Sequence, residues 1–235
     1  MPFYMYYDPT YILVLIGVVL SLLASAKVKT TFAKYSNYRN SNGMTGAQAA
    51  RKVLRSAGIH DVQIEYVSGN LTDHYDPRSK VLRLSETVYG STSVAAVGVA
   101  AHECGHAIQH AHGYGPLKFR SVLVPVANFG SKIAWPLILI GLLINSKSSM
   151  FLIEAGIIAF SLAVLFQLVT LPVEFNASGR AIRILADSGM MYGEEIKAAK
   201  KVLNAAALTY VAAAASGILQ LLRLVLLTRG RRRND

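Results

Sequence analysis

Residues 102–106 read His-Glu-Cys-Gly-His and form a compact chemical motif. Residues four apart lie on one face of an α-helix, so His102 and His106 can each offer a nitrogen to the same zinc ion. Zinc brings the pKa of a bound water toward neutrality, and Glu103 is placed to take its proton and pass it to a leaving amine. The motif predicts a zinc metallopeptidase with one catalytic ion and with Glu103 as catalytic residue.

The non-catalytic alternative is a membrane scaffold or adaptor in which zinc is structural. A structural site gains nothing from Glu103, and a histidine pair flanked by small apolar residues costs burial energy unless it is used. Cys104 is the single cysteine, which excludes an internal disulfide. It points to another face of the helix than the histidines, and we expect it to pack rather than to bind metal.

A catalytic zinc ion needs a third protein ligand and an open fourth position. We expect Glu174 to be that ligand, because a carboxylate among apolar neighbours at a membrane surface needs a partner. Pro172 can start a new helix just before it, as the preceding apolar stretch ends. Ser178, one turn after Glu174, could hydrogen-bond a metal ligand.

Two other residues stay open as the third ligand. His112 follows His102 by ten residues, the metzincin spacing, but Gln109 stands where that motif needs a glycine. Asp187 is similar to the aspartate ligand of site-2-type intramembrane proteases. With Asp187 as ligand, the apolar run 94–101 would enter the bilayer.

The composition indicates a membrane protein. Hydrophobic residues make up 53% of the chain and charged residues 16%, whereas about a quarter of a soluble protein is charged. A helix needs about 20 apolar residues to cross a bilayer. The apolar stretches are 11–26, 121–144, 150–171 and 205–227. The last is alanine-rich and carries Arg223, so we expect three to four transmembrane helices.

The basic residues lie mostly beside these stretches, so the net charge of +11 indicates membrane orientation and not nucleic-acid binding. Residues 1–10 contain no Lys or Arg, which favours an uncleaved anchor over a signal peptide. An aromatic belt precedes the first stretch at Tyr4, Tyr6, Tyr7 and Tyr11. No acid lies between Asp8 and Asp61, whereas seven basic residues do. This excess places 27–120, and the active site, on the cytoplasmic side of a bacterial cell membrane, with the turn 145–149 outside. Arginines 229 and 231–233 would then lie outside if the last stretch spans.

The segment between the first two apolar stretches predicts a small α+β unit. Thr45 is expected to cap a helix over 45–57, and Ser91, Thr92 and Ser93 each offer an N-cap for a long helix over about 93–111. Residues 62–67 and 80–84 alternate like strands, and Asp76–Ser79 is expected to provide the turn that joins them. The fold class is therefore a mainly α membrane protein with a small α+β zincin-like metalloprotease domain. The expected regions are a membrane anchor (1–29), a cytoplasmic zincin-like domain (30–120), a transmembrane hairpin (121–171), a third-ligand helix region (172–204), and a C-terminal apolar helix with a basic tail (205–235).

The chain resembles the YugP-type membrane zinc metallopeptidases of bacteria over roughly residues 30–227. The resemblance is carried by residues 71–85, 94–110, 116–118, 124–130, 168–178 and 201–210. It implies a bacterial membrane protein with His102 and His106 as zinc ligands and Glu103 as catalytic acid and base. The segment at Glu174 is similar, more distantly, to the Glu-x-x-Ala-Asp ligand helix of gluzincin membrane proteases, with Ser178 in place of the aspartate.

Four further residues are candidates for substrate contact. His110 lies one turn after His106 on the same face. His74 precedes the strand 80–84, which could bind an extended peptide if it is an edge strand. Arg183 and Tyr210 are possible donors to the oxyanion that forms on the attacked carbonyl. The ordinary alternatives are a surface histidine, a polar turn and an interfacial aromatic residue.

Together these patterns predict a membrane-anchored zinc metalloendopeptidase that acts on protein or peptide substrates, membrane proteins foremost, at the surface of the lipid bilayer. The alternatives are an intramembrane protease completed by Asp187 and a non-catalytic zinc-containing scaffold.

Overall fold

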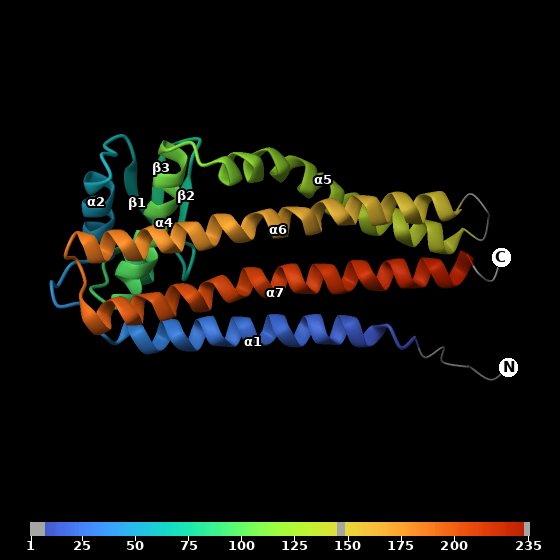
Figure 1. Ribbon diagram of the computed structural model, residues 1–235, viewed down its shortest axis with the longest axis horizontal. Helices are drawn as coiled ribbons and strands as arrows, with labels where there is room; N and C mark the ends of the chain where they lie inside the picture. The colour runs from blue at the N-terminus through green and yellow to red at the C-terminus, as the bar shows by residue number, and fades with distance from the viewer. Residues whose placement is uncertain (1–7, 145–148, 233–235) are drawn as a thin grey trace. The chain divides into compact units, whose positions relative to one another are not determined.

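The computed structural model describes residues 8–144 and 149–232, with side chains up to Thr228. Its elements are α1 (Tyr11–Ser36), α2 (Gly46–Ser56), β1 (Gln63–Val67), β2 (His74–Asp76), β3 (Val81–Ser85), α3 (Glu86–Tyr89), α4 (Val94–Ala111), α5 (Gly115–Leu143), α6 (Ser149–Asp187) and α7 (Gly193–Arg232) (Figure 1). Within this described part, α1, α5, α6 and α7 are long and apolar enough to cross a membrane. The predicted fold class, a mainly α membrane protein with a small α+β part, is confirmed.

The described chain divides into two compact units, and α1, α5, α6 and α7 contribute residues to both. One unit holds the apolar segments up to 23, from 120 to 169 and from 210 onward; the other holds 24–119 and 170–209. Three predicted features lie outside the described residues: the tyrosines at 4, 6 and 7, the turn at 145–148, and the arginine side chains of the tail.

In the apolar unit, small residues let the helices approach closely, as is common in membranes. A Cβ on Gly130 of α5 would lie 2.6 Å from the carbonyl oxygen of Ala159 on α6. Arg223, the charge that made the last apolar stretch doubtful, is paired: it donates to Asp8 at 3.1 Å and lies 4.1 Å from the ring centre of Tyr11. A partner and an aromatic face make a charge in an apolar helix tolerable.

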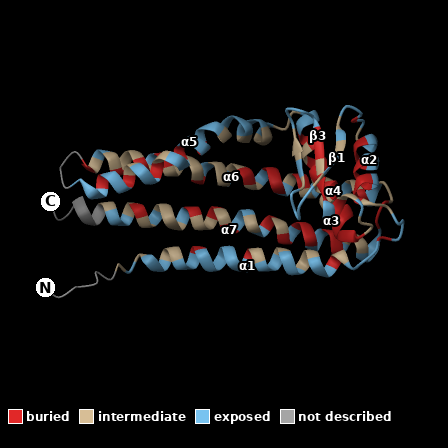
Figure 2. Cartoon of the chain, turned by 180° about the vertical axis from the view of Figure 1, so that it is seen from behind, coloured by how far each residue is buried: buried red, intermediate tan, exposed pale blue. Residues whose placement is uncertain are grey.

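In the second unit, α4 is the central element of the core. Its sequence is rich in alanine and glycine, so neighbouring elements pack closely against its sides, and most of its residues are buried. Figure 2 shows buried residues gathered in α4, α2 and β3. Apolar side chains of α2, β3 and α7, including Val53, Leu84 and Val202, belong to the same core.

The predicted cap of α2 is confirmed, and of the three residues that could cap α4 the structure uses Ser93. Thr45 forms a capping box with Gln48 at the start of α2. The Ser93 hydroxyl accepts the backbone N–H of Ala96 at 3.1 Å and starts α4. The Ser93 cap determines where α4 begins, and the start of the helix determines which way His102 and His106 face.

The two predicted strands do pair, but the predicted turn connection between them is wrong. The sheet has the order β1-β3-β2, in which β1 is parallel to β3 and β2 is antiparallel to it. The turn at 77–80 therefore joins β2 to β3, and not 62–67 to 80–84. The extra strand carries His74 and Tyr75, and it was missed because three residues are too few to show an alternating pattern.

The prediction that Pro172 starts a new helix is wrong. The proline lies inside α6, which runs without interruption from Ser149 to Asp187. Proline removes one backbone donor but need not break a long apolar helix whose neighbours satisfy the freed carbonyl. Glu174 is consequently held on the same continuous helix as the apolar residues 150–171.

Candidate metal centre

Helix α4 places two imidazoles side by side. His102 and His106, one turn apart, have ring centres 4.8 Å apart, and their rings are nearly perpendicular. Their side chains are only 14% and 12% exposed. The Nε2 atoms of both rings face the same point on α6, which makes them the available metal-binding nitrogens.

Helix α6 brings a carboxylate to that point. Its buried face repeats every four residues, at Val173, Ala177, Ala181 and Leu185, and belongs to the same side of the helix that carries Glu174. The Glu174 side chain is 3% exposed, and its Oε2 lies 3.3 Å from Nε2 of His102 and 3.5 Å from Nε2 of His106. Three ligand-type atoms from two helices thus meet in one place.

The spacing of these atoms fits zinc. Two atoms bound to zinc at about 2.0–2.1 Å in a tetrahedral arrangement lie about 3.3–3.4 Å apart. The ligand atoms of His102, His106 and Glu174 lie within 4.8 Å of one another, and no other such group occurs among the residues that the structure describes. Two histidines and one carboxylate are a donor set typical of catalytic zinc, which keeps its fourth position open.

Both histidines are oriented by a second hydrogen bond. Nδ1 of His102 lies 3.0 Å from the Ser178 hydroxyl, and Nδ1 of His106 lies 3.1 Å from Oε1 of Gln109. Because the amide oxygen of Gln109 can only accept, His106 carries its proton on Nδ1, which leaves the Nε2 lone pair for a metal ion. Ser178 was predicted for such a role, whereas Gln109 was noted only as a departure from another motif.

Gln109 also ties α4 to α6. It is fully buried, and its Nε2 donates to the carbonyl of Val173 at 2.8 Å and to Oδ1 of Asn176 at 3.0 Å. Arg180 donates to the same Asn176 oxygen at 2.7 Å. One amide thereby orients His106 and fixes the segment that carries Glu174. No spacing rule pointed to Gln109, but a glutamine on the buried side of the motif helix was an available signal.

The charge of the carboxylates favours a cation here. Burial by itself lowers the pKa of His106, but hydrogen bonding to Glu174 and the charges of Glu103 and Glu174 outweigh it, so this pKa lies above its ordinary value. A bound metal cation would take the place of the proton that the raised pKa of His106 favours.

Burial and the charge of Glu103 raise the pKa of Cys104 well above its ordinary value. Cys104 therefore stays a neutral thiol, and it packs toward the Ala50 carbonyl, as expected for a non-ligand.

Gly105 allows α4 and α6 to approach closely enough for the three ligands to meet. A Cβ at this position would lie 2.5 Å from the carbonyl oxygen of Ala177 and 3.0 Å from its Cα. The close approach is between backbones, so no side-chain rotation could relieve it. The glycine in the motif is thus required by the partner helix.

We expect Gly105→Ala to push α6 away from the histidines. Overpacking of this kind costs about 1–3 kcal/mol of folding stability, and zinc affinity should fall by about tenfold or more as Glu174 moves. Zinc content and the thermal unfolding temperature in detergent measure the two effects. Gly179→Ala is the matched control, because a Cβ there meets nothing within 4 Å; its stability should be unchanged or higher by about 0.5–1 kcal/mol. Equal zinc retention by both variants would contradict the argument.

Four other predicted residues do not belong to the metal-binding group: His112, Asp187, Arg183 and Tyr210. His112 is the C-cap of α4, and Asp187 ends α6; neither belongs to the metal-binding group. Asp187 is 13 residues after Glu174, about 20 Å along the helix axis. The exposed Arg183 lies on α6, and Tyr210 belongs to the apolar unit.

The two remaining candidate histidines lie in or beside strand β2: His74 is its first residue, and His110 contacts Tyr75. Nδ1 of His110 lies 2.9 Å from the Tyr75 hydroxyl, and Nδ1 of His74 lies 2.8 Å from the carbonyl of Thr72. Burial and the charges of Asp61 and Asp76 raise the pKa of Tyr75 to about 12, so its phenol keeps its proton at neutral pH. β2 is an edge strand of the sheet, whereas β3, the strand predicted as a possible edge, is central.

Comparison with known proteins agrees with this geometry. Residues 10–229 match the family described as "Putative neutral zinc metallopeptidase". The chain belongs to this family. It is 51% identical over 208 residues to the "Putative membrane protease YugP" of Bacillus subtilis (strain 168), an alignment that covers 88% of this chain and 91% of that protein. No solved structure matches the chain. The resemblance seen in the sequence is confirmed: the chain is a membrane protein of a zinc-peptidase family.

Proposed function

We propose that the protein is a membrane-anchored zinc metalloendopeptidase, with His102, His106 and Glu174 as ligands of one catalytic ion and Glu103 as general base. The observation that carries the proposal is the convergence of Glu174 Oε2 on both imidazole Nε2 atoms, at 3.3 and 3.5 Å. Three protein ligands leave one position for water and substrate, whereas a structural site is closed by four. This supports catalysis over a scaffold role.

Each residue then has a defined task. When bound, zinc supplies a water of lowered pKa and polarises the attacked carbonyl. Glu103, adjacent to His102 on α4 and 9% exposed, takes the proton of the attacking water and delivers it to the leaving amine. Gln109 and Ser178 hold the imidazoles in the orientation that exposes Nε2.

The protein's setting suggests its substrates and its orientation. Glu174 lies on α6, which also contains an apolar, membrane-length stretch, and a site built on such a helix suits membrane proteins or their exposed segments. Basic residues without acids follow the first such stretch, beginning with Lys27, Lys29 and Lys34, which supports a cytoplasmic active site. The intramembrane alternative required Asp187 as ligand, and its distance along α6 from Glu174 argues against that arrangement.

Removal and return of the metal test this function. The purified full chain in detergent should cleave an unfolded test protein, lose that activity on treatment with a chelator such as 1,10-phenanthroline, and regain it with about one equivalent of zinc. Product peptides are measured by mass spectrometry. Cleavage that persists in metal-free protein would overturn the proposal, as would metal binding at one equivalent without any cleavage of folded or unfolded substrates.

A further inference from the structure

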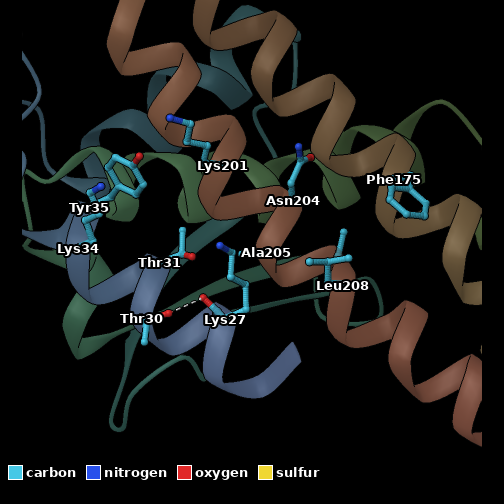
Figure 3. Close-up of a pocket in the computed structure, with 11 residues that line it drawn as sticks. Lys27, Thr30, Thr31, Lys34, Tyr35, Phe175, Lys201, Asn204, Ala205 and Leu208 are labelled. Atoms are coloured by element: carbon cyan, nitrogen blue, oxygen red, sulfur yellow. Dashed lines mark hydrogen bonds between the residues drawn. The ribbon is translucent and has the colours of Figure 1, made fainter. Parts of the chain in front are cut away.

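The unit that holds the metal centre also contains a cavity whose lining includes none of the three metal ligands. Residues of α1, α6 and α7 line an open cavity of about 790 Å³, which the basic side chains of Lys27, Lys34 and Lys201 border (Figure 3). None of the described residues that line it is acidic. A volume of this size accommodates a small ligand, and its charge selects an anion.

A neighbouring cavity is lined by Glu194 and Glu195 and is also bordered by Lys34 and Lys201, and Lys34 lies 5.5 Å from the ring centre of Tyr35. Within the described part of the chain, the three lysines are nonetheless not held in ion pairs: none of them forms a salt bridge with an aspartate or glutamate. All three side chains are exposed. Like charges that share a cavity repel one another, so an anion bound among them would lower the electrostatic energy. The gain is largest for a compact, multiply coordinated anion such as a phosphate group.

Neutral polar groups complete the lining. The hydroxyls of Thr30 and Thr31 and the side-chain amide of Asn204 border the cavity. Thr30 donates to the backbone carbonyls of Ala26 and Lys27, so its oxygen is still able to accept a hydrogen bond. Asn204 and the lysines are the donors that phosphate oxygens need, and the threonine hydroxyls suit the hydroxyls of a glycerol group.

One part of the lining is apolar. Phe175 is 50% exposed and Leu208 is 46% exposed, and both border the cavity. Figure 3 shows these two side chains on α6 and α7, together on one side, whereas Lys34 and Lys201 lie away from them. The cavity therefore offers a charged region for a headgroup and an apolar region for the start of an acyl chain.

The positions of these residues along their helices point to a membrane–water boundary. Lys27 directly follows the apolar residues 11–26 of α1, and Phe175 follows the apolar residues 150–171 of α6. On α7, Lys201 precedes the apolar residues 205–227. All three helices thus line the cavity where their sequences change from apolar to polar. Basic cavities at such places between membrane helices recognise lipid headgroups.

We infer that this cavity binds the headgroup of an anionic phospholipid, with its phosphate among the three lysines and its glycerol end toward Phe175 and Leu208. The inference stands independently of proteolysis, because it rests on a different set of side chains. The cavity and the metal centre are adjacent in sequence, since Phe175 directly follows Glu174 on α6.

Lipid binding to the full chain tests the inference. Zinc-loaded protein in a neutral detergent is titrated with dioctanoyl phosphatidylglycerol, dioctanoyl phosphatidylcholine or glycerol phosphate, and bound lipid is counted by native mass spectrometry. We expect phosphatidylglycerol to bind about tenfold more tightly than phosphatidylcholine. Glycerol phosphate should compete weakly, because it lacks the acyl chains.

Variants locate the binding. The triple variant Lys27→Gln, Lys34→Gln, Lys201→Gln should weaken phosphatidylglycerol binding by about tenfold or more, and the corresponding three lysine-to-arginine changes should keep it. The control triple variant Lys29→Gln, Lys52→Gln, Lys200→Gln removes the same charge outside the cavity lining and should leave binding within about twofold. Unchanged zinc content establishes that the variants are folded.

Several outcomes would overturn the inference. Equal weakening by both glutamine triples would mean that general surface charge attracts the lipid. Equal affinity for phosphatidylcholine would remove the role of the lysines. Competition by glycerol phosphate, or by a soluble acidic peptide, at the same concentration as the lipid would assign the cavity to a water-soluble anion instead.

Discussion

Glu103→Gln should reduce the turnover number of the zinc-loaded protein by on the order of 10²–10⁴-fold, the usual contribution of a general base. The amide keeps the shape of the side chain but cannot take the proton of the attacking water. The metal ligands are untouched, so zinc content should stay at one equivalent. Single-turnover cleavage of an unfolded protein and metal analysis of the same sample measure the two quantities.

The control for Glu103 is Glu86→Gln, an exposed glutamate in the first turn of α3. It makes the same chemical change and should leave both turnover and zinc content unaltered. Full activity of the Glu103→Gln protein with zinc bound would exclude Glu103 as the base. The same variant in cells should accumulate uncut membrane proteins, and the identity of those proteins would name the substrates.

Glu174→Gln should empty the metal centre. Loss of an orienting partner alone costs about 10–100-fold in metal affinity, so loss of a direct ligand should cost more than about 100-fold. The amide oxygen is a poorer ligand for zinc than a carboxylate, and the two imidazoles would remain alone. Competition with a chromogenic chelator gives the affinity, and cleavage activity should disappear together with the metal.

Asp187→Asn distinguishes the two candidate carboxylates. Asp187 ends the same helix but lies outside the group formed by His102, His106 and Glu174. Its variant should keep zinc and activity at the level of the unmodified chain. If Asp187→Asn alone lost the metal while Glu174→Gln kept it, the ligand assignment would be wrong, and the intramembrane arrangement would be favoured.

Elements with strong local signals could be predicted correctly. Thr45 and Ser93 are caps whose partners lie three residues away, so the starts of α2 and α4 depend only on neighbouring sequence. The apolar stretches are equally local, because length and hydropathy alone decide whether a helix can cross a bilayer. The two motif histidines share a face for the same reason, since helix geometry determines their spacing.

Elements that depend on distant partners were missed. β2 is only three residues long and is stabilised by its pairing with β3, through registers such as Tyr75 with Leu82. Pro172 is a helix breaker by local rules, yet it lies within α6, whose next turns are held by the buried residues Val173, Ala177 and Ala181. In both cases tertiary contacts outweigh the local preference.

The metal centre shows the same division. The helical turn His102-Glu103-Cys104-Gly105-His106 could be predicted from the sequence alone. Residues four apart on a helix always share one face, so the two imidazoles must lie side by side. That Glu174 lies against them, 68 residues after His106, was a prediction among three candidates. Only the tertiary structure brought its Oε2 between the two Nε2 atoms, through the backbone approach of Gly105 to Ala177 and the hydrogen bonds of Gln109. These are contacts between helices, and no periodicity within one helix encodes them.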